Sequence, residues 1–337
     1  MSVNIIELEP MPVRPRLTPA MADARRAVRE LLEELDLEPG SLFLVACSGG
    51  PDSMALAAAS AFEIPKAGHR VGAVIIDHGL QANSQVVAQE AAQRCSALGL
   101  DPVIVEQVKV TPMGEGLEAA ARDARYSALE KARAEHSASY VLLGHNQDDH
   151  AETVLLGLAR GSGLRSISGM PQIDQERSLV RPLLDISRAE LRQSCLDQDL
   201  EFWDDPHNQD ESFLRVRVRK LAGELEKTLG AGFQAALART ADLAFEADDF
   251  LAQQARAVLA ASDNDSGLAV GSVEGLHPAL RRKTIQLYLQ SISGTAISRA
   301  QVLEVEQLVI NWHGQKKLDL SGITVERVND RLLVTAN

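Results

Sequence analysis

The strongest constraint on the fold is an alternation of short apolar runs with helical patterns in the first half of the chain. LFLVAC (42–47), VGAVIID (71–77), PVIVEQV (102–108) and SYVLLG (139–144) are mainly apolar, and a helical pattern follows each of them. Strands that are apolar on both faces are typical of a parallel sheet covered by helices on both sides. We therefore expect an α/β fold whose ligands bind at the carboxyl ends of the strands.

The second half of the chain has a different pattern. Residues 221–261 are helical and rich in Ala and Leu, and the remaining residues mix helices with strand-like runs near the end. A length of 337 residues suits about two domains. We predict a catalytic α/β domain over residues 1–220, and a helical connector with a small substrate-binding domain over residues 221–337.

Composition excludes several classes of protein. The chain has 34 Lys and Arg against 47 Asp and Glu, a net charge of −13, which excludes a compact basic nucleic-acid module but not a local basic face. The three cysteines are far apart and form no Cys-x-x-Cys pair, which argues against a disulfide framework or a cysteine-rich metal site. No apolar run reaches the ~18 residues of a membrane span, and the start does not read as a signal peptide. We expect no membrane contact and a cytoplasmic location.

The strongest local signal is SGGPDS (48–53), which follows the first apolar run and opens a helix. Gly49 and Gly50 allow backbone N–H groups to approach an anion, and the amino end of the helix adds partial positive charge. The two serines add hydroxyl donors, so the loop suits phosphate. Asp52 would repel phosphate unless Mg²⁺ lay between them. The alternative is a tight turn with a capped helix.

Ionisable side chains also follow later strands. Asp77 and His78 end the second apolar run, and His145 follows the fourth, with Asp149 and Glu152 at spacings of four and three that share one helical face. Such groups at the carboxyl edge of a sheet indicate a functional site. Zinc is an alternative without an evident coordinating scaffold, and caps or core roles are another.

Arginines occur in patterns that suit phosphate. Arg122 and Arg125 share one face of the helix expected over residues 116–135 and form either a phosphate contact or a solvated ion-pair face. If FLRVRVRK (213–220) is strand-like, its arginines face one way; the alternative is a solvated edge. The basic residues of 281–283 either extend an RNA surface or carry ordinary solvated charge.

The motifs together resemble a known family. The strand–SGGPDS–helix unit resembles the pyrophosphate loop of the N-type ATP pyrophosphatases. Four later segments resemble tRNA(Ile)-lysidine synthetases in content and order: GHNQDDHAET (144–153), GLARGSGLRSISGMP (157–171), VRPLLDISRAEL (180–191) and WDDPHNQDESFLRVRVRK (203–220). The resemblance covers most of residues 25–335, with Asn146 in place of a common His and Val216 in place of an Asn. It implies a short form without the further C-terminal domain of longer relatives.

This resemblance implies an activity and its site. The family ligates free L-lysine to the wobble cytidine of isoleucine tRNA with a CAU anticodon, through an adenylated cytidine, using ATP and Mg²⁺ and releasing AMP and pyrophosphate. Carried over residue by residue, the resemblance implies ATP binding by Ser48, Gly49, Gly50, Asp52, Ser53, Asp77, His78 and His145; Mg²⁺ binding by Asp52; lysine binding by Asp149 and Glu152; tRNA binding by Arg125, Arg160, Arg215, Arg217 and Arg219; and catalysis by Asp52, Asp149 and Arg122.

Two rival functions stay open on the sequence alone. One is a related ATP-dependent tRNA thiolase, in which Cys47 beside the phosphate loop would take part in sulfur chemistry. The other is a nucleotide-gated RNA-binding protein that binds ATP without turnover. A homodimer is a further possible state of the chain.

Overall fold

The structure, a computed structural model, describes residues 17–79, 83–108, 117–161, 163–262, 267–320 and 322–336. The chain divides into two compact units, one of Met1–His150 with Pro171–Ala235 and the other of Ala151–Met170 with Ala236–Asn337. The division lies later than the boundary expected near residue 220, because helix α8 (Leu214–Leu229) runs unbroken through that position.

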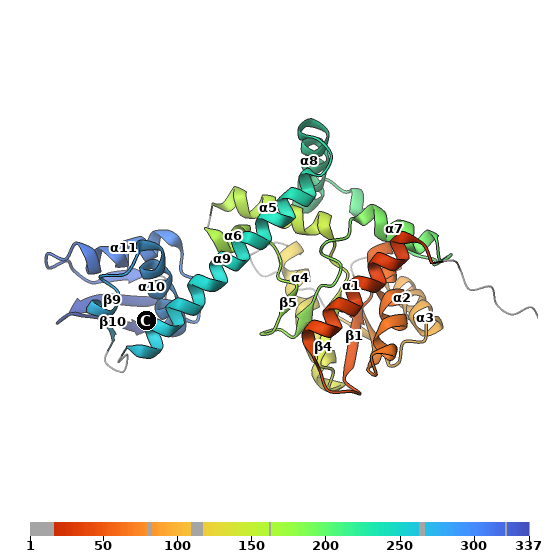
Figure 1. Cartoon of the computed structure of the whole chain (residues 1–337), viewed down its shortest axis with the longest axis horizontal. Coiled ribbons are helices and arrows are strands. Elements are labelled where there is room, and N and C mark those ends of the chain that lie inside the picture. The colour runs from red at the N-terminus through yellow and green to blue at the C-terminus, as the bar shows by residue number, and fades with distance from the viewer. Residues whose placement is uncertain are drawn as a thin grey trace, which may run out of the picture. The chain divides into compact units, whose positions relative to one another are not determined.

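The first unit contains a six-stranded sheet in the order β3–β2–β1–β4–β6–β5 (Figure 1). Its strands are β1 (Leu42–Ala46), β2 (Arg70–Asp77), β3 (Val103–Gln107), β4 (Tyr140–Leu143), β5 (Ile173–Asp174) and β6 (Leu179–Val180). All neighbouring pairs are parallel except β5 with β6. The strand order reverses at β1, which pairs with β2 on one side and β4 on the other. Ligands bind at such a switch point in open α/β sheets.

Helices cover both faces of this sheet, as the apolar strands predict. On one face lie α1 (Pro19–Leu35), α2 (Pro51–Lys66), α3 (Ser84–Ala97) and α7 (Arg188–Leu196), and on the other lies α4 (Leu117–Glu135). Residues of β1 alternate between the two cores: Phe43 and Val45 pack with the first group of helices, and Leu42 and Leu44 pack against α4.

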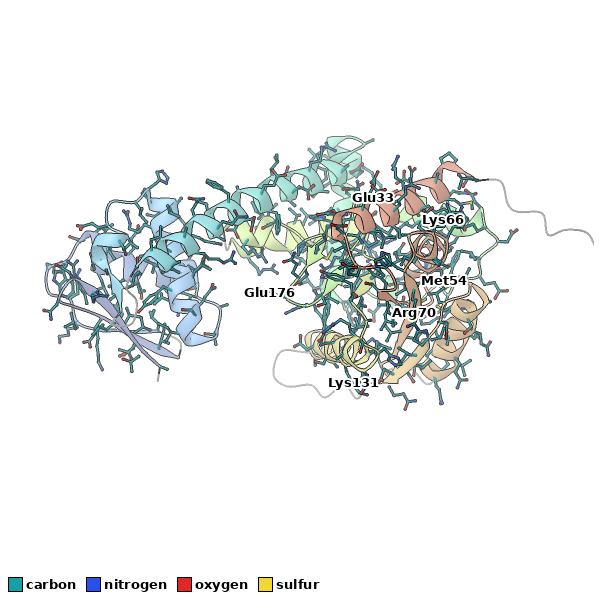
Figure 2. The ribbon with its side chains drawn as sticks, turned by 60° about the horizontal axis from the view of Figure 1, so that its bottom comes forward. Glu33, Met54, Lys66, Arg70, Lys131 and Glu176 are labelled. Carbon is teal, nitrogen blue, oxygen red and sulfur yellow. The ribbon has the colours of Figure 1, made fainter. Side chains whose placement is uncertain are left out.

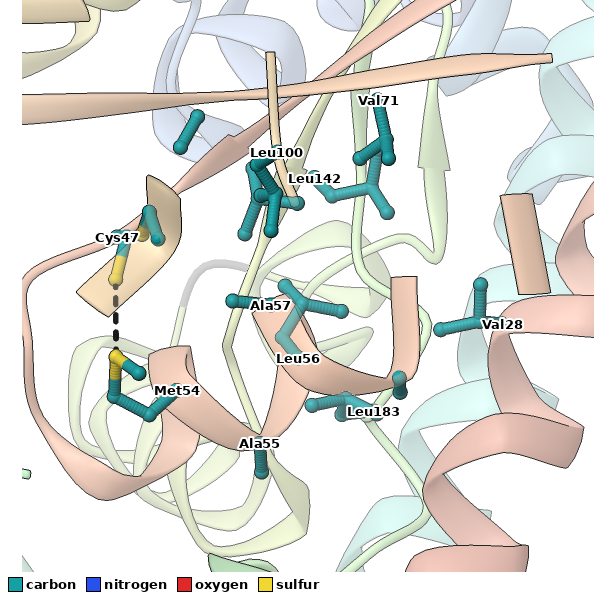
Figure 3. Packing of buried hydrophobic residues seen from close by; sticks show 14 of the residues in the cluster. Val28, Cys47, Met54, Ala55, Leu56, Ala57, Val71, Leu100, Leu142 and Leu183 are labelled. Atoms are coloured by element: carbon teal, nitrogen blue, oxygen red, sulfur yellow. Dashed lines mark hydrogen bonds between the residues drawn. The ribbon is translucent and has the colours of Figure 1, made fainter. Parts of the chain in front are cut away.

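The core next to the phosphate loop is dense. Figure 3 shows Leu56, Leu142 and Leu183 among its buried residues, and each of the three is fully buried. The Sγ atom of Cys47, at the end of β1, lies 3.7 Å from the Sδ atom of Met54 in α2. In Figure 2, Met54 lies inside the unit, while Lys66 and Lys131 carry exposed side chains. The loop between β1 and α2 is therefore anchored at both ends by buried side chains.

The second unit combines helices with an antiparallel sheet. Its sheet has the order β7–β10–β9–β8, with β7 (Leu268–Ala269), β8 (Leu318–Leu320), β9 (Ile323–Val328) and β10 (Arg331–Ala336). Its helices include α6 (Leu164–Ile167), α10 (Pro278–Ser293) and α11 (Arg299–Ile310), while α5 (Gln147–Arg160) and α9 (Phe233–Ala261) begin in the first unit. None of the helices in the described ranges is long and apolar enough to cross a membrane.

The basic group of residues 281–283 does not form a free RNA surface. Glu306 of α11 accepts hydrogen bonds from Nε of Arg281 and Nε of Arg282, both at 2.8 Å. Nζ of Lys283 lies 2.7 Å from a carboxylate oxygen of Asp248 in α9. Of the two alternatives for these residues, the structure favours charges that are paired within the second unit, because all three cations contact carboxylates there.

Candidate active site

The phosphate loop connects β1 directly to α2. Gly49 has a φ of +80°, a conformation that favours glycine, and a Cβ atom there would lie 3.2 Å from Cβ of Ala91. The Ser53 hydroxyl donates to the Gly50 carbonyl at 2.9 Å and accepts from the Ser48 amide at 3.2 Å. The Trp203 amide donates to the Gly49 carbonyl at 2.8 Å. The loop is thus held in shape by its own serine and by a segment about 150 residues later.

A cavity of about 580 Å³ opens beside this loop at the carboxyl ends of the strands. The expected site residues that line it are Ser48, Gly50, Asp52, Ser53, Asp77, His78, Arg125, His145, Asp149, Arg215 and Arg219. The expected residues that do not line it are Gly49, Arg122, Glu152, Arg160 and Arg217. All lining residues belong to the first unit. The structure therefore brings the predicted phosphate loop, strand-end groups and two of the basic-segment arginines together.

Two carboxylates dominate the electrostatics of the cavity. Oδ2 of Asp52 lies 3.7 Å from Nε of Arg188, and Oδ1 of Asp149 lies 2.6 Å from Nη2 of the same arginine. The pKa of Asp52 is raised to about 6, mainly by burial and to a smaller extent by Asp149, against the opposing effect of Arg188. Oδ1 of Asp52 is buried and has no hydrogen-bond partner among the described residues. An unsatisfied buried carboxylate oxygen fits a cation ligand.

Asp149 is positioned by the start of α5. The Asp149 amide donates to Oδ1 of Asn146 at 2.9 Å, and the Asn146 amide donates to Oδ2 of Asp149 at 3.2 Å. This reciprocal pair is a helix cap of the kind that satisfies the first amides of a helix. Asn146 is fully buried, so the residue that departs from the family pattern still fixes the carboxylate of Asp149.

The strand-end groups differ in charge. Although burial opposes ionisation, hydrogen bonds from Ser84, Gly79 and Gln107 lower the pKa of Asp77. Burial and then the guanidinium of Arg125 lower the pKa of His78 and, more strongly, that of His145. Both imidazoles are therefore neutral at pH 7. Their Nδ1 atoms are buried and have no partner in the described part of the chain.

The basic segment is a helix and not a strand. Residues 214–229 form α8, so the strand-like run that would turn all these arginines to one side is not present. The alternating Arg-Val pattern is overridden by the strong helix formers that continue the segment to Leu229. In a helix, Arg215 and Arg219 are one turn apart and both line the cavity, whereas Nη1 of Arg217 donates to the carbonyls of Glu211 and Ser212.

Arg122 and Arg125 of α4 also differ in their positions relative to the cavity. Arg125 is half-buried and lines the cavity, whereas Arg122 is exposed and its Nη2 lies 3.3 Å from the hydroxyl of Tyr126. Glu152 is buried in α5, one turn beyond Asp149, and Arg160 is exposed at the end of α5 in the second unit.

Several lining residues were not predicted, among them Arg188, Arg192, Trp203, Asp204 and Asn208. Arg188 begins α7 and Arg192 lies one turn further along it, and Ser187 and Glu190 form a capping box at the start of this helix. That capping signal, [ST]-x-x-E, is visible in the sequence and locates the helix start. It does not reveal that Arg188 contacts Asp52 and Asp149, because these residues precede it in the sequence by 136 and nearly 40 positions.

The described residues contain no group of three or more His, Cys, Asp or Glu side chains arranged to hold a metal ion. The three cysteines are unpaired and buried. Cys47 lines the cavity, and the neighbouring Cys95 thiol lowers its pKa to about 7. The polar groups of the site are thus carboxylates, imidazoles and guanidiniums around a phosphate loop.

Comparison with known proteins identifies two family models. A PP-loop domain model matches residues 21–225, and a TilS substrate binding domain model matches residues 268–333. Among solved structures, the U34-tRNA thiolase NcsA from Methanococcus maripaludis has a TM-score of 0.57 over 67% of this chain and 80% of that chain. Its sequence identity is 17%, so this likeness concerns the fold alone. The expected parallel-sheet PP-loop fold is confirmed.

Curated relatives extend over nearly the whole chain. A tRNA(Ile)-lysidine synthase of Leifsonia xyli subsp. xyli is 48% identical over 88% of this chain and 90% of its own length. That of Streptomyces coelicolor is 46% identical over 88% of this chain and 86% of its own length. That of Thermobifida fusca is 43% identical over 95% of this chain and 98% of its own length. The resemblance drawn from the motifs is confirmed: the chain belongs to the tRNA(Ile)-lysidine synthase family.

Proposed function

We propose that the chain ligates free L-lysine to the wobble cytidine of isoleucine tRNA with a CAU anticodon, at the expense of ATP. The observation that carries this proposal is the meeting of the phosphate loop and Asp149 in one cavity. The first suits ATP, and the second suits an ammonium group. The names of the relatives supply the identity of the RNA.

ATP phosphates would lie against the Ser48–Ser53 loop, where backbone amides and the start of α2 favour negative charge. Asp52 would hold Mg²⁺, and its unsatisfied Oδ1 supports this assignment. When bound, the ion would neutralise phosphate charge. The neutral imidazoles of His78 and His145 and the carboxylate of Asp77 would hold the nucleotide from the neighbouring strand ends.

The cytidine carbonyl oxygen would attack the α-phosphate, forming the adenylated base and releasing pyrophosphate. Arg125 suits the stabilisation of charge at this step, since it lines the cavity and Arg122 does not. We therefore assign to Arg125 the catalytic role that the resemblance placed on Arg122. The lysine amine would then displace AMP from the base.

Lysine would be received by Asp149, whose carboxylate is fixed by the Asn146 cap. A carboxylate binds the ammonium form and assists loss of its proton before attack. Glu152, which the resemblance also places in lysine binding, is buried one turn along α5 and does not line the cavity, so the proposal assigns the ammonium group to Asp149.

The tRNA would contact the arginines of α8. Arg215 and Arg219 reach the cavity, and Arg217 is exposed beside it on the same helix. Arg160, which belongs to the second unit, stays a proposed tRNA contact on the family resemblance alone. Such contacts position the RNA through its phosphates and make binding strongly dependent on salt. A cytoplasmic location and a homodimer remain predictions.

The test is pyrophosphate release from ATP with isoleucine and methionine CAU transcripts, each with and without labelled lysine. The proposal predicts release that needs the isoleucine transcript and label that enters that RNA. Asp149→Asn should abolish incorporation, whereas Asp148→Asn should keep most of it, because Asp148 does not line the cavity.

Other outcomes contradict the proposal. Pyrophosphate release without lysine incorporation would favour the thiolase alternative. ATP binding without any release would favour a nucleotide-gated RNA-binding protein.

A further inference from the structure

Arg188 occupies an unusual position between the two carboxylates of the cavity. It is the first residue of α7, and the capping box of Ser187 and Glu190 fixes its backbone. Its amide donates to Oδ2 of Asp148 at 2.9 Å. Both the backbone and the side chain of Arg188 are therefore held against the start of α5.

The guanidinium of Arg188 is bound to the carboxylate of Asp149, which is expected to receive lysine. Nη2 donates to Oδ1 of Asp149 at 2.6 Å, and Oδ2 of Asp149 accepts from the Asn146 amide at 3.2 Å. Nη2 of Arg219 lies 3.8 Å from the same Oδ1. Both oxygens of Asp149 are thus engaged, and a lysine ammonium that reaches Asp149 meets a guanidinium already bound there.

The same guanidinium also faces the phosphate loop. Its Nε lies 3.7 Å from Oδ2 of Asp52, the carboxylate assigned to Mg²⁺, and its side chain is 25% exposed to the cavity. A guanidinium binds phosphate oxygens with two parallel hydrogen bonds and remains charged at any physiological pH. A nucleotide entering this loop brings phosphate oxygens beside Arg188. A cation bound at Asp52 would repel the guanidinium of Arg188 and weaken its contact with Asp52.

We propose that Arg188 determines the order of substrate binding: it covers the ammonium subsite on Asp149 until a nucleotide's phosphates draw it away, so that ATP binds before lysine. The inference rests on the proposed function and adds a coupling between its two small substrates. Arg188 also limits repulsion between Asp52 and Asp149 in the nucleotide-free protein, because it keeps a cation beside both carboxylates.

The proposal predicts a reciprocal coupling. An ATP analogue that is not cleaved between the α- and β-phosphates should tighten lysine binding by about tenfold or more, and lysine should tighten analogue binding by the same factor. Equilibrium dialysis with labelled lysine and calorimetry with α,β-methylene-ATP and Mg²⁺ measure the two sides on the full chain. Neither readout depends on turnover.

Variants test the residue itself. In Arg188→Gln, lysine affinity should become largely independent of the analogue, because the guanidinium that donates to Oδ1 of Asp149 is removed and Arg219, 3.8 Å away, makes the weaker contact. Arg188→Lys keeps a positive charge between the two carboxylates, so this variant should fold even if Arg188→Gln does not. Lysine lacks the planar guanidinium that makes two parallel hydrogen bonds to phosphate, so the coupling should be smaller than in the unsubstituted protein but still measurable.

Arg192→Gln is the matched control. Arg192 lies one turn further along α7 and lines the same cavity, but its guanidinium pairs with Asp204 at 2.7 and 2.8 Å. This variant should retain the nucleotide dependence of lysine binding.

Equal lysine affinity with and without the analogue in the unsubstituted protein, including no binding in either state, would overturn the ordering role. So would full coupling in Arg188→Gln. Lysine incorporation into RNA tests the proposed function separately: incorporation without coupling refutes the ordering alone, and its absence refutes the function.

Discussion

Replacing Asp52 by Asn should stabilise the first unit, and the gain should depend on pH. Burial raises the pKa of this carboxyl from 3.8 to about 6, although Arg188 opposes the shift. The folded protein therefore binds a proton more tightly than the unfolded chain, and stability falls as pH rises from 3.8 to about 6. A shift of this size corresponds to about 3 kcal/mol of unfolding free energy.

The Asp52→Asn variant does not lose stability in this way as pH rises, because asparagine does not titrate. Its unfolding free energy minus that of the unsubstituted protein should rise between pH 4 and pH 6.5 by up to about 3 kcal/mol and then level off. The side chain is 23% exposed, so the full value is an upper bound. Increased stability at the expense of function is typical of a group placed for binding.

Urea unfolding followed by fluorescence of Trp203 measures this difference in a Trp312→Phe background. The chain has two tryptophans, and Trp203 alone belongs to the first unit. Asp204→Asn provides a control of opposite sign. Hydrogen bonds from Arg192 lower the pKa of Asp204, so the unsubstituted protein should become more stable relative to this variant as pH rises. A difference for Asp52→Asn that is flat or shrinks with rising pH would refute the reasoning.

Three further predictions follow from single contacts. Glu306→Gln should lower the unfolding free energy of the second unit by about 3–5 kcal/mol, measured by thermal unfolding, because it leaves the buried guanidinium of Arg281 without its carboxylate. Arg125→Ala should reduce pyrophosphate release by about 100-fold or more, and Arg122→Ala by less than about threefold, since only the first lines the cavity; the reverse ranking would restore the original assignment. Cys47→Ser should retain lysine incorporation, and its loss would point to sulfur chemistry at the buried thiol.

Patterns along the chain were sufficient for the fold class and for most of the cavity. The phosphate loop and the strand-end groups Asp77, His78 and His145 are local features, because a parallel sheet brings the carboxyl ends of its strands to one edge. Asp149 follows His145 by one helical turn and could be placed in the same way. These predictions needed only the period of the apolar residues and the topology of the sheet.

The arginines could not be assigned in this way. For residues 213–220 the sequence left open a strand-like run or a solvated edge, whereas the helix formers that follow extend the segment into α8. Similarly, the spacing of Arg122 and Arg125 placed both on one face, but only the structure shows that one reaches the cavity and the other contacts Tyr126.

By itself, the sequence determined the alternating α/β architecture, the position of the phosphate loop and the family, because these depend on local periodicity and contiguous motifs. Only the tertiary structure decided which cation faces which carboxylate. Arg188 meets Asp52 and Asp149 across long stretches of chain, and Arg281 turns inward to Glu306. The physical reason is that charge pairing depends on distances in space between distant segments, which residue type and spacing do not encode.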